Sequence, residues 1–109
     1  MQVTINGKNV RLNFGVGFVR ELDRYFGLSN QAGFNLGLGL TKAIPGLKSY
    51  DTSVLSEVIQ CASEPRVSLA DVDALIDDPK TDIEKLFDEV LRNLEKANAV
   101  KLAVKKLKG

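Results

Sequence analysis

Hydrophobic and polar residues alternate at the start of the chain, on both sides of an Asn-Gly pair. This pair, Asn6-Gly7, is typical of a two-residue hairpin turn, because both turn positions need a positive φ. The pattern predicts strands over about residues 2–6 and 8–13. Two strands alone are marginal in water, so another element has to cover their apolar face. The alternating apolar residues are Val3, Ile5, Val10 and Leu12.

Apolar residues with helical spacing follow the hairpin and predict a helix over about residues 15–26. Gly27 is well placed to end it, because glycine tolerates the left-handed conformation of a helix cap. Five of the seven aromatic residues fall in the segment 14–34. Packing beside the hairpin is favoured over an aromatic recognition surface.

The segment 28–50 fits two patterns. Strict alternation from Phe34 to Leu40 is typical of a strand, but Leu36, Leu40 and the apolar residues up to Leu47 also share one helical face. We predict a helix over about residues 35–47, kinked or ended near Ile44-Pro45-Gly46. Gly37 and Gly39 weaken a helix, but they would permit close approach of a neighbouring helix.

Three further helices are predicted from spacing and end signals. One begins behind Asp51 and Thr52, either of which can cap it, and stops before Glu64-Pro65. A short one starts at Ser68 and ends at Asp77-Asp78-Pro79. The last covers about residues 82–97, with Thr81 and Glu84 as a capping box.

The C-terminal segment 98–109 again leaves two alternatives. Val100, Ala103 and Val104 would extend the last helix, whereas alternation of Val100, Leu102 and Val104 with lysines would make a strand that joins the hairpin. The whole pattern predicts an α+β fold that is mainly α. It consists of an N-terminal β-hairpin followed by about five helices, in a single domain spanning residues 1–109.

Composition excludes much chemistry. The chain has no histidine and one cysteine, so histidine-based acid–base catalysis, an ordinary zinc site and an internal disulfide are all excluded. There is no signal-peptide pattern and no apolar run long enough to span a membrane. Because one cysteine cannot form an internal disulfide, we expect a reducing cytoplasm as the location. We expect no enzyme activity, no cofactor and no metal site.

The remaining chemical candidates are weak. Two G-x-G pairs do not continue as G-x-G-x-x-G, and the acidic pairs Asp71/Asp73 and Asp77/Asp78 lack the other residues of a calcium loop. Cys61 lies beside an apolar stripe near acidic residues. A small buried hydrophobe is therefore the favoured interpretation for its side chain.

Charge is distributed unevenly although the formal net charge is only +1. Residues 71–95 carry nine acids and three bases, whereas residues 96–109 carry five lysines and no acid. Helix dipoles favour such an order, which is the simpler interpretation. The functional alternative is a small regulatory or nucleic-acid-associated protein that acts through the lysine-rich tail. Nucleic-acid binding is disfavoured, because the tail has no arginine and no aromatic residue.

With these elements placed, the chain resembles the tail assembly chaperones of long-tailed (siphovirus-type) phages and prophages of Gram-positive bacteria. The resemblance covers nearly the whole chain and depends on the order and spacing of several segments. They are Met1-Gln2-Val3-Thr4-Ile5-Asn6-Gly7-Lys8, Leu12-Asn13-Phe14-Gly15, Phe18-Val19-Arg20-Glu21-Leu22-Asp23, Gly37-Leu38-Gly39-Leu40, Ala43-Ile44-Pro45, Ile83-Glu84-Lys85-Leu86-Phe87-Asp88-Glu89-Val90, Asn98-Ala99-Val100-Lys101-Leu102 and Lys105-Lys106-Leu107.

The resemblance implies a non-enzymatic role in virion assembly. Such proteins coat the aggregation-prone tape measure protein and help to bring tail tube subunits to it. The family commonly makes a longer product by ribosomal frameshifting near the end of the reading frame, and the extension is thought to recruit tube protein. Lys105-Lys106 stand where a slippery run of adenines could lie.

A chaperone of this kind needs apolar surface that accepts amphipathic helices, together with modest affinity. The lysines would attract acidic partner helices. The competing interpretation is that each apolar candidate belongs to the core or to a homo-oligomer interface. The candidate partner-binding residues are Leu86, Val90, Leu94, Lys101, Leu102, Lys105, Lys106 and Leu107.

Overall fold

The N-terminal hairpin forms as the alternating pattern predicts. The computed structural model describes residues 1–26 and 38–108 of the chain. In it β1 (Gln2–Ile5) pairs antiparallel with β2 (Lys8–Leu12). Asn6 has φ 57° and Gly7 has φ 75°, so both turn positions lie in the region that this hairpin turn requires. The hairpin prediction is confirmed.

The third strand comes from the middle of the chain. β3 (Ser63–Glu64) pairs antiparallel with β2, with Leu12 opposite Ser63, which gives the sheet order β1-β2-β3. The alternative in which residues 98–109 add a strand to the hairpin is therefore wrong. The extended backbone required before Pro65 supplies the strand instead.

The first helix, α1 (Val16–Tyr25), and the residues just before it supply an aromatic contact of the core. Phe14 and Phe18 are buried, with ring centroids 5.1 Å apart and planes almost perpendicular. For these two residues the core interpretation is confirmed, whereas Tyr25 is 44% exposed. The predicted cap at Gly27 lies outside the described residues.

The second helix, α2 (Leu38–Lys48), confirms the helical interpretation of this segment as far as it is described. Residues 34–37, where the strand alternative began, lie outside the described ranges. Of the two alternatives near Ile44-Pro45-Gly46, an end of the helix is wrong, because α2 continues through Pro45 to Lys48, whereas a kink there stays a prediction. Pro45 is exposed, while Ile44 and Leu47 on either side of it are buried. Burial of these two side chains stabilises the helix by more than the missing backbone N–H of Pro45 costs.

Helices α1 and α2 approach closely at Gly39. A Cβ at this position would lie 3.0 Å from the carbonyl carbon of Leu22, so only glycine fits without a shift. The Gly39 backbone N–H donates a hydrogen bond of 2.7 Å to Oδ1 of Asp23, which is 1% exposed. A carboxylate is favourable beside the positive N-terminal end of a helix, so Asp23 ties α1 to α2.

The central helix is α3 (Thr52–Ala62), which contacts α1, α2, α4 and β2. Asp51 is its cap, because Oδ1 accepts hydrogen bonds from the backbone N–H groups of Ser53 and Val54. The helix ends before Glu64-Pro65 as predicted. Most of its side chains are buried, so the core surrounds it: Val54, Leu55, Ser56, Val58, Ile59, Cys61 and Ala62.

The next two helices begin at side-chain caps. α4 (Leu69–Asp77) starts behind Ser68, as predicted. α5 (Ile83–Lys96) starts behind Asp82, whose Oδ1 accepts from the Lys85 N–H. The predicted Thr81–Glu84 capping box is wrong, because the Thr81 hydroxyl instead donates to the Leu75 carbonyl oxygen of α4 at 2.7 Å. The aspartate one residue later takes over the cap.

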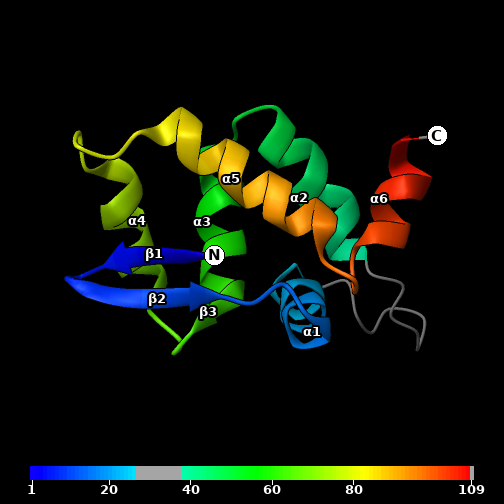
Figure 1. Ribbon diagram of the computed structural model, residues 1–109, viewed down its shortest axis with the longest axis horizontal. Helices are drawn as coiled ribbons and strands as arrows, with labels where there is room; N and C mark the ends of the chain where they lie inside the picture. Colours follow the sequence, from blue (N-terminus) through cyan, green and yellow to red (C-terminus); the bar gives the residue numbers. More distant parts are fainter. Residues whose placement is uncertain (27–37, 109) are drawn as a thin grey trace.

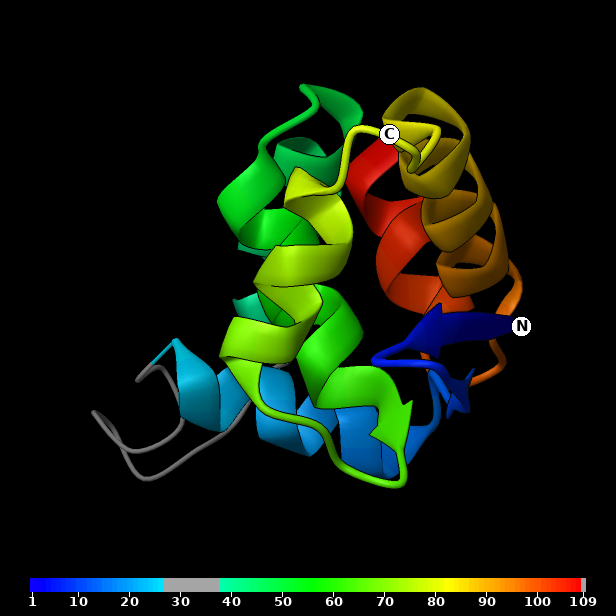
Figure 2. The same cartoon turned by 90° about the vertical axis from the view of Figure 1, so that its left-hand side faces the viewer.

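The chain ends in a separate helix, α6 (Lys101–Lys108). Residues 97–100 form a turn, so α6 is helical as one alternative held, but it does not extend α5. Val100 and Val104 anchor it in the core. Figure 1 shows the sheet at one end of the long axis and α6 at the other, with α5 crossing between them. Figure 2 shows α3 and α4 side by side above α1.

Candidate functional site

Three predicted partner-binding residues lie inside the molecule. Leu86 is 9% exposed, and Val90 and Leu94 are fully buried on the face of α5 that packs against the rest of the core. For these three the structure supports the core interpretation, which was the competing one. Val90 and Leu94 offer no surface to a partner, whereas Leu86 is one wall of a surface hollow of about 290 Å³ beside Val3 and Leu75.

The predicted residues on α6 are placed differently. Leu102 is 76% exposed, and Lys101 and Lys105 are also exposed. Val104 is buried, so α6 is amphipathic, and Leu102 is the one large apolar group among the described side chains of its basic outer face. The side chains of Lys106 and Leu107 lie outside the described part of the structure. Lys101, Leu102 and Lys105 are therefore the described members of the candidate surface on α6.

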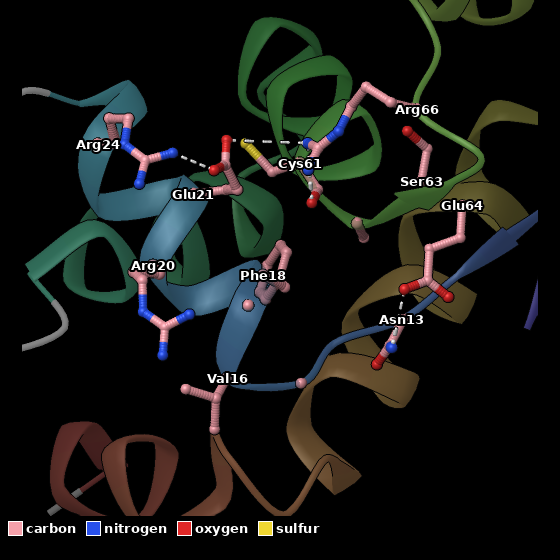
Figure 3. Close-up of a pocket in the computed structure, with 13 residues that line it drawn as sticks. Asn13, Val16, Phe18, Arg20, Glu21, Arg24, Cys61, Ser63, Glu64 and Arg66 are labelled. Carbon is pink, nitrogen blue, oxygen red and sulfur yellow. Dashed lines mark hydrogen bonds and ion pairs between the residues drawn. The ribbon is translucent and has the colours of Figure 1, made fainter.

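A polar cleft of about 320 Å³ lies between α1 and the segment that joins α3 to α4 (Figure 3). Most of its charged groups are held by contacts inside the cleft, whereas Arg20, which also lines it, shows no ion pair among the described residues. Glu21 forms an ion pair with Arg24, and its Oε2 lies 4.0 Å from an Arg66 guanidinium nitrogen. The Asn13 side-chain amide donates to Oε2 of Glu64 at 3.1 Å. These contacts attach α1 to the β3 region, so we interpret the cleft as structural.

Cys61 borders this cleft and is buried, as the sequence predicts. Burial raises the pKa of its thiol to about 11. That value includes a lowering by the charge of Arg66 and smaller increases from the charges of Glu21 and Glu57. The thiol is neutral near pH 7 and is a poor nucleophile or metal ligand. Within the described ranges no group of three or more acidic or cysteine side chains is arranged to hold a metal ion.

A second, apolar hollow of about 340 Å³ is one that the sequence reasoning missed. Tyr50, Ile83 and Phe87 supply its apolar walls, with Thr52 and Glu84 beside them. It joins the end of α2 to the start of α5, two segments more than 30 residues apart in the chain. A large aromatic residue directly before the Asp51 cap was the signal available in the sequence.

One comparison with known proteins gives a match. A family model described as phage tail assembly chaperone protein, TAC, matches residues 2–108. No curated protein and no solved structure matches the chain. Among the described helices, none combines the length and apolar character that crossing a bilayer demands.

Proposed function

This chain belongs to the phage tail assembly chaperone family, and from that premise we propose that it binds the tape measure protein and helps to bring tail tube protein to it. Binding is reversible and involves no cofactor or covalent step. The site of action is the cytoplasm of the infected or lysogenic host. The observation that carries the proposal is the family match across residues 2–108.

The outer face of α6 supports this proposal physically. An exposed leucine flanked by two lysines one turn apart can contact the apolar stripe of a helix and attract acidic side chains beside it. Long-range attraction between such charges speeds encounter more than it strengthens the complex. The resulting modest affinity suits a protein that the polymerising tail tube has to displace.

Co-expression tests the proposal directly. The tape measure protein, produced with the full chain, should remain in the supernatant and co-purify with it. The matched control is the tape measure protein expressed alone. Aggregation of the tape measure protein in both cultures, with no complex recovered, would contradict the proposal.

A salt series separates this function from the nucleic-acid alternative. Binding through phosphate contacts loses affinity steeply and linearly on a log–log plot as salt rises. We expect no such binding to duplex or single-stranded DNA at 150 mM salt, a concentration of about physiological ionic strength. Tight, salt-sensitive DNA binding that is lost when the α6 lysines are replaced would favour the alternative.

A longer product made by frameshifting near Lys105-Lys106 is part of the proposal, because it would link tube protein to the coated tape measure. Peptide mass spectrometry of infected cells should detect peptides that cross from this frame into an overlapping one. A gene without an overlapping frame at those codons would exclude the longer product.

A further inference from the structure

Tyr50 has a backbone conformation that bulky residues rarely adopt. Its φ is 59°, in the left-handed region. The Tyr50 N–H donates to the Leu47 carbonyl oxygen and the Asp51 N–H donates to that of Gly46, at 3.2 and 2.9 Å. This is the hydrogen-bond pattern of a Schellman motif, in which glycine is the usual residue at the left-handed position. A tyrosine at this position makes the folded state less stable than a glycine would, and non-glycine residues in the left-handed region are concentrated at functional sites.

The Tyr50 side chain is displayed at the surface. It is 51% exposed, although its ring packs edge-on against buried Phe87 with 5.1 Å between centroids. Together with Ile83 the two rings form the apolar walls of the 340 Å³ hollow. Ile83 and Phe87 are four residues apart on α5, so they present two apolar contacts one helical turn apart.

The rim of this hollow is acidic. Glu84 lines the hollow, and Asp88 lies beside it, where its Oδ1 accepts a hydrogen bond of 3.4 Å from the Tyr50 hydroxyl. Both acids are exposed, and neither forms an ion pair within the described part of the chain. Lys85, on the same helix, pairs with Glu89 and not with these two acids: its Nζ lies 3.8 Å from Oε1 of Glu89. The charge of Asp88, followed by burial and the charge of Glu84, raises the pKa of the Tyr50 hydroxyl. A negative field therefore reaches the ring that walls the hollow.

We propose that the hollow between Tyr50, Ile83 and Phe87 is a docking groove for a basic amphipathic helix of the tape measure protein. The acidic rim selects lysine and arginine side chains, while the apolar walls take residues one turn apart. This proposal rests on the proposed function. The acidic groove at the start of α5 would be a second contact site, opposite in charge to the basic face of α6. A helix that carries both acidic and basic patches could then touch both.

A second copy of this chain is the competing occupant, because α6 is basic and exposes Leu102. However, the C-terminal segment already buries Val104 of α6 and Val100, the residue before it, in the core of the chain itself. Among the described side chains of α6, Leu102 is the one large apolar group left outside, whereas the groove accommodates two contacts.

The experiment uses the full chain and synthetic peptides tiled along the tape measure protein, with affinity measured by fluorescence anisotropy. Peptides that combine basic residues with an apolar stripe should bind, and more weakly as salt rises. Tyr50→Ala should weaken this binding by about tenfold or more. Tyr50→Gly should weaken it equally while the fold persists, because glycine suits the left-handed position. Glu84→Gln with Asp88→Asn should reduce both the affinity and its salt dependence.

Two control variants lie outside the groove. Tyr25→Ala removes a tyrosine of similar exposure at the end of α1, and Asp77→Asn removes an exposed acid at the end of α4. Both should bind as the unmodified chain does. Circular dichroism and a thermal melt establish that each variant is folded before its affinity is compared.

The possible outcomes distinguish the docking groove from the proposed chaperone function. If the unmodified chain binds and the Tyr50 variants bind equally well, the groove is wrong and the chaperone function stands. Binding restricted to acidic peptides would also overturn the groove. Self-association of the chain alone in sedimentation, abolished by the Tyr50 variants, would assign the groove to a second copy. If no peptide and no intact tape measure protein binds, both proposals fail.

Discussion

At the residue scale, two non-glycine residues with positive φ illustrate different physical situations. Asn6 occupies a turn position for which asparagine is a preferred residue, and the alternating pattern around it already indicates the hairpin. Tyr50 occupies a helix end for which its ring gives no backbone advantage. The conformation of Tyr50 could not be predicted, because the glycine that usually marks the left-handed position of a Schellman motif is absent there.

Two substitutions of Tyr50 should differ in stability. Tyr50→Gly and Tyr50→Ala both remove the ring, but only glycine relieves the left-handed backbone, which costs other residues about 1 kcal/mol. The free energy of unfolding of Tyr50→Gly should therefore exceed that of Tyr50→Ala by about 1 kcal/mol. Urea denaturation of the two variants measures this difference. Equal stabilities would mean that residue 50 is unstrained.

Burial of Cys61 should control both its reactivity and the alkaline stability of the protein. The folded-state pKa of about 11 lies above the ordinary value of 9.0, so the folded protein retains the thiol proton that the unfolded chain loses. This contribution to stability is fully present below about pH 9 and is lost as pH rises toward about 11. A disulfide reagent at pH 8 should react slowly until urea is added. Fast reaction with the folded chain would contradict the assignment.

At the element scale, most boundaries follow from caps and proline. Asp51 and Ser68 cap the helices that the sequence assigns to them, and Pro65 keeps α3 short. The start of α5 is less clear from sequence, because Thr81 and Asp82 are both good caps. Tertiary structure decides between them, since the Thr81 hydroxyl reaches the last turn of α4.

Removing the α5 cap tests this assignment. Asp82→Ala should lower the free energy of unfolding by about 1 kcal/mol, because it leaves the Lys85 N–H without its acceptor. Thr81→Ser keeps a hydroxyl that can donate to Leu75 and is the matched control, with a much smaller effect expected. Chemical denaturation measures both. If Thr81→Ala proved costly and Asp82→Ala neutral, Thr81 would be the cap after all.

Glycines inside helices have different roles according to what lies beside them. A Cβ on Gly46 would lie 2.9 Å from Cγ2 of Val54, so Gly46→Ala should destabilise the protein by about 1–3 kcal/mol through overpacking. Gly17 in α1 has open space, so Gly17→Ala should stabilise by about 0.5–1 kcal/mol. Thermal melts compare the two. Val54→Ala should partly rescue Gly46→Ala, and additive effects would argue against direct contact.

At the scale of the whole molecule, burial divides the predicted partner-binding residues into two groups. Leu86, Val90 and Leu94 complete the core, whereas Leu102 stays on the surface. Amphipathic spacing alone cannot make this distinction, because an apolar stripe packs equally well against its own core or a partner. The division is visible only when α2 and α6 cover α5.

Paired substitutions in α6 test the surface role. Leu102→Ser should leave the melting temperature almost unchanged, because the side chain is 76% exposed, but it should reduce co-purification of the tape measure protein. Val104→Ser, in the same helix, should lower the melting temperature, because Val104 is 6% exposed and packs in the core. Full retention of the tape measure protein by folded Leu102→Ser would exclude Leu102 from the contact.

The sequence by itself determined the hairpin, the helical character of most segments, the caps at Asp51 and Ser68 and the resemblance to a chaperone family. The hairpin, the helices and the caps depend on local backbone preference and on periodicity, which neighbouring residues set, whereas the resemblance depends on several segments of the sequence and their order. Tertiary structure alone decided the third strand, the continuation of α2 through Pro45, the burial of the α5 stripe and the hollow beside Tyr50. Each of these depends on the contacts between segments distant in sequence, where burial of apolar surface outweighs local preference.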